Sequence, residues 1–107
     1  MSRDLDLLFV AKTPLGFTVR VTRAYWDIIS TLKHPVMRGH LDEVRAALDS
    51  PDEIRLSKTD DQVYLFYKIQ RPGRWVCAVS RRTDSEGFLI TAYPTDAIKE
   101  GEQIWPI

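Results

Sequence analysis

Two kinds of hydrophobic spacing divide the first half of the chain. Apolar residues alternate with polar or smaller ones on both sides of the turn formers Pro14 and Gly16, which predicts an N-terminal β-hairpin over residues 1–22. From Thr22 to Pro51 the apolar residues recur at helical spacing in two runs. The His34-Pro35 step separates the runs, because proline disfavours helix for the residue before it. We therefore expect two short helices after the hairpin, with Thr22 as an N-cap.

Alternation returns after Pro51 in four strand-like segments. They cover residues 53–57, 63–69, 75–81 and 88–93, and short linkers rich in turn formers join them. Consecutive strands joined this closely must be antiparallel, since a parallel return needs a crossover of a dozen or more residues. The predicted fold is α+β: two short helices packed on one face of an antiparallel four-stranded meander, with an N-terminal β-hairpin, in a single domain of residues 1–107.

Composition and charge restrict the function classes. The chain has 107 residues, 44% hydrophobic, and its 15 basic residues cancel 15 acidic ones, so no global field favours nucleic acid or an anionic membrane. A local basic excess lies between residues 54 and 82, a stretch that contains seven basic residues and two acidic ones, Asp60 and Asp61. The basic residues are Arg55, Lys58, Lys68, Arg71, Arg74, Arg81 and Arg82.

Three features that the sequence lacks bear on where in the cell the protein is found. Cys77 is the single cysteine, which excludes an internal disulfide or a thiolate cage. No apolar run approaches the roughly 20 residues of a membrane span. The acidic N-terminus, with Asp4 and Asp6, is unlike a signal peptide. We expect a cytoplasmic protein with no membrane association.

The last predicted strand carries two hydroxyl groups at its end. Thr91 and Tyr93 alternate with the apolar residues of the strand, and Pro94 follows directly. If the helices cover the apolar positions of the sheet, the opposite face gathers basic and hydroxyl side chains: Arg55, Ser57, Lys68, Thr91 and Tyr93. Cations interleaved with aromatic rings are suited to phosphate contacts and base stacking.

Several motifs in order resemble a known family. They are Lys33-His34-Pro35, a short amphipathic helix, the run from Ser50 to Arg55, the Tyr64-Leu65-Phe66-Tyr67 strand, and the run from Gly87 to Thr95 followed by Ile98-Lys99. Together they resemble the barnase, EndoU, colicin tRNase and RelE-like (BECR-fold) nuclease superfamily, in its phage-type branch. The resemblance covers roughly residues 34–105. It implies metal-independent RNA cleavage without a cofactor, and membership of toxin, effector or mobile-element systems. If the domain is a toxin, a candidate partner is an antitoxin whose acidic segment lies across the basic face.

The resemblance also implies roles for individual residues. Metal-free RNA cleavage needs a base, an acid and donors for the charge that builds on the phosphate. The implied catalytic residues are His34 for acid–base work, Lys68 for phosphate charge, and Thr91 and Tyr93 for hydrogen bonds to the scissile group. The implied substrate-binding residues are Arg55, Tyr67 and Arg71. On this hypothesis His34→Ala and Lys68→Ala each abolish cleavage, and no metal site is expected.

A second interpretation needs no catalysis. His34 then ends a helix with its ring bonded to a last-turn carbonyl, Thr91 and Tyr93 serve strand formation, and the cations are solvated. The domain becomes a protein-binding or assembly module, such as a homodimer, that pairs its open sheet or hairpin with another subunit by strand addition. Zero net charge favours the module, whereas the local basic excess favours the nuclease.

Overall fold

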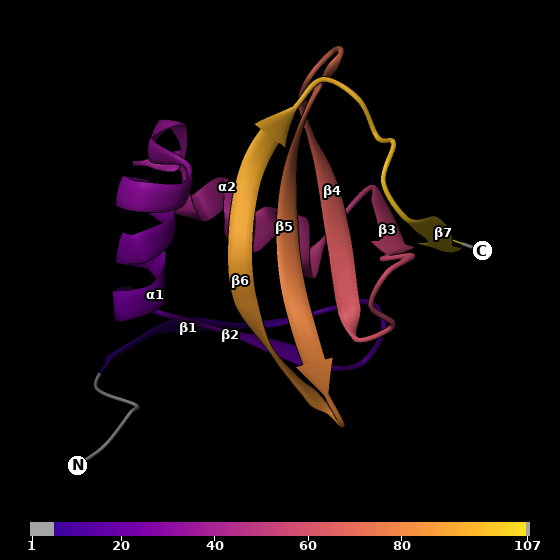
Figure 1. The fold of residues 1–107 in the computed structure, drawn as a ribbon, viewed down its shortest axis with the longest axis horizontal. Coiled ribbons are helices and arrows are strands. Elements are labelled where there is room, and N and C mark those ends of the chain that lie inside the picture. The colour runs from indigo at the N-terminus through magenta and orange to yellow at the C-terminus, as the bar shows by residue number, and fades with distance from the viewer. Residues whose placement is uncertain (1–5, 107) are drawn as a thin grey trace.

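A seven-stranded sheet organises the protein, as seen in the computed structural model, which describes residues 6–106 (Figure 1). The strand order is β1-β2-β6-β5-β4-β3-β7. The strands are β1 (Leu7–Lys12), β2 (Thr18–Thr22), β3 (Glu53–Leu56), β4 (Val63–Arg71), β5 (Arg74–Thr83), β6 (Glu86–Thr95) and β7 (Glu102–Trp105). The α+β class, the hairpin β1-β2 and the antiparallel meander β3-β4-β5-β6 are confirmed.

The sheet is larger and more mixed than the predicted four-stranded meander. β2 pairs in parallel with the start of β6, from Thr18 opposite Glu86 to Arg20 opposite Phe88, so the hairpin is part of the sheet. Gly87 makes this approach possible, because a Cβ at this position would lie 2.9 Å from the Arg81 carbonyl oxygen and 3.2 Å from the Phe17 ring. At the other edge, β7 adds an antiparallel strand to β3.

The two helices form where the hydrophobic spacing predicted them. α1 (Arg23–Ile28) begins after Thr22, whose hydroxyl accepts a hydrogen bond from the Tyr25 backbone N–H at 3.2 Å. It continues into a π-helical turn (Ile29–Lys33) that ends at His34, directly before Pro35. A 3₁₀ turn (Pro35–Met37) then leads to α2 (Leu41–Asp49).

The main core lies between these helices and one face of the sheet. α2 buries Val44, Ala47 and Leu48 against the strands, where Phe66 and Ala78 are fully buried. Burying a large apolar side chain contributes about 1.5–3 kcal/mol, so this layer supplies most of the driving force for folding.

The other face of the sheet is also apolar and is partly covered. Leu65, Tyr67, Cys77 and Val79 form a second buried cluster there, and Ile98 packs against it. Ile98 belongs to the crossing segment, residues 96–101, which runs from the end of β6 across this face to β7 (Figure 1). The second face is therefore a shallow covered groove with an apolar floor, whereas the sequence predicted an open polar surface.

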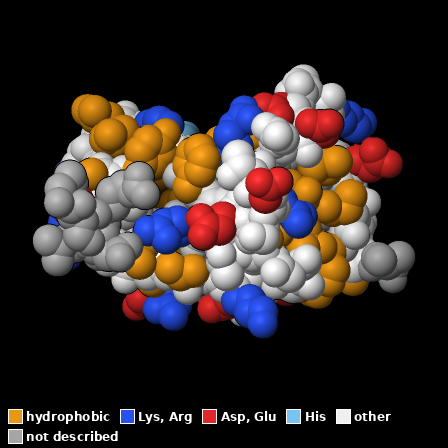
Figure 2. Space-filling model, turned by 90° about the horizontal axis from the view of Figure 1, so that it is seen from below, with side chains coloured by type: hydrophobic (Ala, Val, Ile, Leu, Met, Phe, Trp, Pro, Cys, Tyr) orange, Lys and Arg blue, Asp and Glu red, His pale blue; other side chains and the backbone are white. Residues whose placement is uncertain are grey.

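Charges of both signs are mixed on the surface near the hairpin. Seen from below, hydrophobic side chains gather toward the two ends of the molecule, and basic and acidic side chains lie interspersed between them (Figure 2). This face therefore offers no surface of a single sign to a polyanion. The described residues include no helix that is both long enough and apolar enough to cross a membrane.

Candidate functional site

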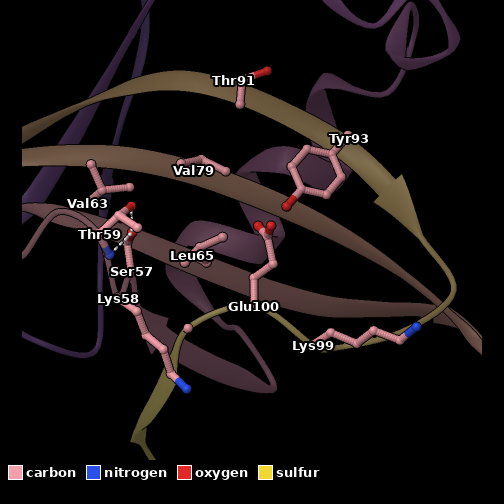
Figure 3. A pocket seen from close by; sticks show the side chains of 11 residues that line it. Ser57, Lys58, Thr59, Val63, Leu65, Val79, Thr91, Tyr93, Lys99 and Glu100 are labelled. Atoms are coloured by element: carbon pink, nitrogen blue, oxygen red, sulfur yellow. Dashed lines mark hydrogen bonds between the residues drawn. The ribbon is translucent and has the colours of Figure 1, made fainter.

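Two adjoining clefts, each of about 480 Å³, lie where the crossing segment passes over the sheet. The His34 cleft is lined by His34, Tyr67, Tyr93, Thr95, Asp96, Ala97, Lys99 and Glu100. The Lys58 cleft is lined by Ser57, Lys58, Thr59, Val63, Leu65, Val79, Thr91, Tyr93, Lys99, Glu100 and Gly101 (Figure 3). Tyr93, Lys99 and Glu100 belong to both clefts and form the boundary between them.

His34 reaches the His34 cleft from the end of the first helical segment. Its backbone N–H donates to the Ile29 carbonyl at 2.7 Å, and its ring lies 5.5 Å from the Tyr93 ring, centroid to centroid. The preceding Lys33 donates through Nζ to the Ile90 carbonyl of β6 at 2.9 Å. These contacts hold the helix end beside β6, so that the imidazole lines a cleft on the face opposite α2.

Glu100 enters both clefts from the crossing segment. The segment begins with a turn in which the Thr95 hydroxyl donates to the Ala97 carbonyl at 3.0 Å. It ends at Gly101, whose carbonyl accepts a hydrogen bond from the Arg55 guanidinium at 3.2 Å. Figure 3 shows the Glu100 side chain reaching from this segment toward the hydroxyl of Tyr93. The carboxylate is therefore held over the sheet by contacts at both ends of the segment.

Tyr67 and Tyr93 line the His34 cleft, and the fully buried Cys77 thiol lies against both of them. Burial raises the pKa of the Cys77 thiol to about 12, although hydrogen bonds with Tyr93 and Tyr67 oppose the shift. Burial also raises the pKa of Tyr67 and Tyr93 well above the ordinary range, and the neighbouring Cys77 adds to it. At neutral pH the two hydroxyls are therefore hydrogen-bond donors, and none of the three groups serves as a base.

The Lys58 cleft combines cations and hydroxyls with an apolar floor. Lys58 and Lys99 extend from the β3–β4 loop and the crossing segment, and Leu65 and Val79 lie on the sheet below (Figure 3). The buried Thr91 hydroxyl oxygen has no hydrogen-bond partner among the described residues. The cleft can hold a ligand with one apolar surface and a negative charge at its rim.

The structure brings together four of the residues that the sequence singled out. His34, Tyr67 and Tyr93 line the His34 cleft, and Thr91 joins Tyr93 in the Lys58 cleft. The alternation along β6 predicted the shared face of Thr91 and Tyr93, which their pairing with Val79 and Cys77 confirms.

Lys68 does not join them, which corrects the expected grouping. Lys68 pairs with Val76 on the helix-covered face, and its Nζ donates to the Ser50 carbonyl at the end of α2 at 2.8 Å. β4 is apolar on both faces, with Phe66 buried in one core and Leu65 in the other. Alternation alone therefore could not say which side the helices cover.

The other two cations lie outside both clefts. Arg55 is on the cleft side of the sheet, but its guanidinium is bound to the Glu53 carboxylate at 2.6 Å and to the Gly101 carbonyl. It supports the crossing segment and lines neither cleft. Arg71 is exposed at the end of β4 and lines a separate small pocket beside Arg74.

Three charged residues of the clefts were not predicted as site residues: Lys99 and Glu100, which line both clefts, and Lys58, which lines one. Lys99 and Glu100 lie in a segment with no periodic pattern, and Lys58 lies in a loop. The one local signal is Gly101, a turn former between this polar run and the apolar pair Ile104 and Trp105. Such a signal predicts a turn and does not say what the turn crosses.

The described residues include no group of three or more His, Cys, Asp or Glu side chains placed to hold a metal ion. The chain also stands apart in comparisons: no protein-family model, no curated protein and no solved structure matches it.

Proposed function

We propose that this protein is a ribonuclease-like domain that cleaves RNA by metal-independent acid–base chemistry in the His34 cleft. The observation that supports this most strongly is the lining of that cleft, which includes an imidazole, a carboxylate and an ammonium group: His34, Glu100 and Lys99. These groups match the base, acid and phosphate-neutralising cation that the reaction needs.

The proposed reaction is a transesterification that starts from a single-stranded RNA. The Glu100 carboxylate takes the proton of a ribose 2′-hydroxyl, and the 2′-oxygen attacks the adjacent phosphorus. The bond from phosphorus to the 5′-oxygen breaks, and protonated His34 gives its proton to that oxygen. The products are a 2′,3′-cyclic phosphate and a 5′-hydroxyl. Lys99 and the neutral Tyr93 hydroxyl stabilise the charge on the phosphate oxygens.

The Lys58 cleft fits a nucleotide next to the scissile bond. Its floor of Leu65 and Val79 offers apolar contact to a base, while Lys58 at the rim offers charge to a phosphate. Because Glu100 and Tyr93 line both clefts, a nucleotide held there would place its phosphate beside the acid–base pair.

A cleavage assay with end-labelled RNA tests the proposal. His34→Gln and Glu100→Gln should each lower the rate by about 10²–10⁴-fold, which is the usual contribution of a general acid or base. The matched control is Glu102→Gln, two residues from Glu100 but exposed in β7 and outside both clefts. The geometry further predicts that Lys68→Ala retains activity, because Lys68 lies on the other face.

Two outcomes would refute the proposal. One is a purified wild-type protein that leaves no 2′,3′-cyclic phosphate on any RNA, and the other is unchanged cleavage by both cleft variants. A toxin role adds a cellular test, in which expression arrests the growth of a host and His34→Ala restores it. In that case the antitoxin would be a protein whose acidic segment covers Lys58 and Lys99.

A second candidate function, an assembly module, is favoured by a different observation. Ile28, Leu32 and Val36 are 39%, 77% and 59% exposed and recur at four-residue spacing along the first helical segment and the 3₁₀ turn. Ile28 and Leu32 share one helical face, and Val36 follows the break at His34. Exposed apolar side chains of this kind suit contact with a second copy of the chain. Light scattering would show a dimer that Leu32→Glu dissociates. A monomer at high concentration would exclude this candidate.

A further inference from the structure

A small cationic pocket lies on the helix side of the sheet, beside the end of β6. It has a volume of about 160 Å³ and is lined by Val36, Met37, His40, Gln70, Arg71, Arg74 and Pro94. A pocket of this size is below the range of about 300–1,000 Å³ that is typical for drug-sized ligands. Its polar lining carries two guanidinium groups and an imidazole, so it suits a small anion.

Arg74 contributes an unsatisfied hydrogen-bond donor to the pocket. Its Nε is buried and finds no acceptor among the described residues. A buried charged donor without an acceptor is destabilising, and an oxyanion in the pocket would remove that cost. Arg71 is exposed at the opposite end of the same β-turn, so both guanidinium groups can approach one ligand.

The nearby carboxylate of Glu43 contacts two of the pocket residues but does not line the pocket. Glu43 is bound to His40 Nδ1, and it accepts a hydrogen bond from Gln70 Nε2 at 2.8 Å. Through the contact with Nδ1, Glu43 orients the imidazole of His40, and through the contact with Nε2 it orients the Gln70 amide.

We propose that Arg71, Arg74 and His40 form a subsite for a phosphate group. Arginine pairs are well suited to tetrahedral oxyanions because several N–H groups can bind in parallel. This pocket and the His34 cleft lie on opposite faces of the sheet: Pro94 follows Tyr93 in β6, and Val36 lies two residues after His34. β2 pairs with β6 only up to Phe88, so a chain that occupies both sites would pass round this end of β6. If the domain cleaves RNA as proposed above, the phosphate is that of a nucleotide beyond the scissile bond. That part of the inference depends on the proposed function.

The pocket itself is tested with inorganic phosphate. In a ¹⁵N-labelled protein, the Arg74 Nε–H resonance should shift saturably as phosphate is added. The internal control is the Arg82 Nε–H, which already donates to the Asp84 carbonyl at 2.6 Å and should shift little. Equal, unsaturated shifts of both resonances would overturn the subsite. Arg71→Gln, at an exposed position, should weaken the Arg74 response without lowering the melting temperature.

A second arm identifies the source of the phosphate. Non-cleavable 2′-O-methyl oligonucleotides of two and six nucleotides are titrated onto the wild type and onto Arg71→Gln and Arg74→Gln. Each variant should bind the six-nucleotide ligand about tenfold more weakly, as expected for one lost charged hydrogen bond, and bind the dinucleotide unchanged. Arg45→Gln, whose guanidinium stacks on Phe9, is the matched control.

The outcomes separate this inference from the proposed function. A saturable phosphate response without any length-dependent loss would overturn the RNA assignment and leave a site for free phosphate. Length-dependent binding in a protein that never cleaves RNA would support the subsite and refute catalysis. An absent phosphate response would overturn the subsite even if the cleavage assay succeeded.

Discussion

Replacing Gly101 by alanine tests how the crossing segment is held. Gly101 has φ +83°, which lies in the left-handed region that side chains disfavour, and an added Cβ would lie 2.7 Å from the Leu56 carbonyl oxygen and 3.1 Å from the Arg55 Cβ. Gly16 provides a matched control, because it has φ +95° in the hairpin turn but open space around the position of a Cβ. The pair separates backbone strain from steric conflict.

The two contributions have different magnitudes. A left-handed backbone costs a residue with a Cβ about 1–2 kcal/mol, and both variants bear this cost. Only Gly101→Ala also presses a methyl group against a backbone oxygen of β3, and overpacking of this kind costs about 1–3 kcal/mol. We expect Gly16→Ala to lower the free energy of unfolding by about 1–2 kcal/mol and Gly101→Ala by about 2–5 kcal/mol.

Urea denaturation followed by circular dichroism measures both values. A domain of this size is expected to unfold in one cooperative step, so a lower midpoint at constant slope reports lower stability. The cleavage assay adds a second readout, because displacing Gly101 would move the neighbouring Glu100 out of the clefts. If the two variants were equally stable and equally active, the crossing segment would not be fixed by the contact with Leu56.

Two further predictions concern pH. Because the pKa of Cys77 is about 12 in the fold and that of a free thiol about 8.5, the unfolded state loses this proton first as pH rises, so the urea midpoint should fall between about pH 9 and 12. Cys77→Ala should reduce this loss of stability at high pH. The same dependence of the urea midpoint on pH in the variant and the wild type would contradict this assignment to Cys77. Burial opposes ionisation of Glu43, but hydrogen bonds from Gln70 and His40 outweigh it and lower the pKa below 4.5. The stability from this carboxylate should therefore disappear as pH falls below about 4.5, and Gln70→Ala should shrink that loss in acid-unfolding curves.

The elements that the sequence predicted well are those with local signals. Three of these signals are the N-cap at Thr22, the stop before Pro35 and the apolar stripe of α2. Each depends on only a few consecutive residues, so each can be recognised in the sequence. The hairpin and the meander follow in the same way from short linkers. Local patterns therefore give the elements and most of their neighbours.

The position of the hairpin in the sheet could not be predicted in this way. β2 and β6 are separated by both helices and three strands, and their parallel pairing depends on the Cβ-free surface of Gly87 meeting Phe17. In the sequence Gly87 is one of several turn-forming residues, and no periodicity links it to Phe17. The parallel contact is a property of the packed fold.

The residues of the candidate site also differ in whether a local signal marks them in the sequence. His34 directly follows the last helical turn, and the sequence identified it because element ends carry local signals. Tyr93 was identified by the alternation of β6, although the strand does not end before Pro94 as predicted but continues to Thr95. Glu100 and Lys99 are placed by β7, a four-residue strand whose pairing with β3 pulls the crossing segment over the sheet. Four residues are too few to show a clear alternation of apolar and polar positions, so the sequence did not predict the pairing of β7 with β3. It nevertheless places Glu100 in the cleft that His34 lines, so the proposed acid–base pair depends on the shortest strands at the edge of the sheet.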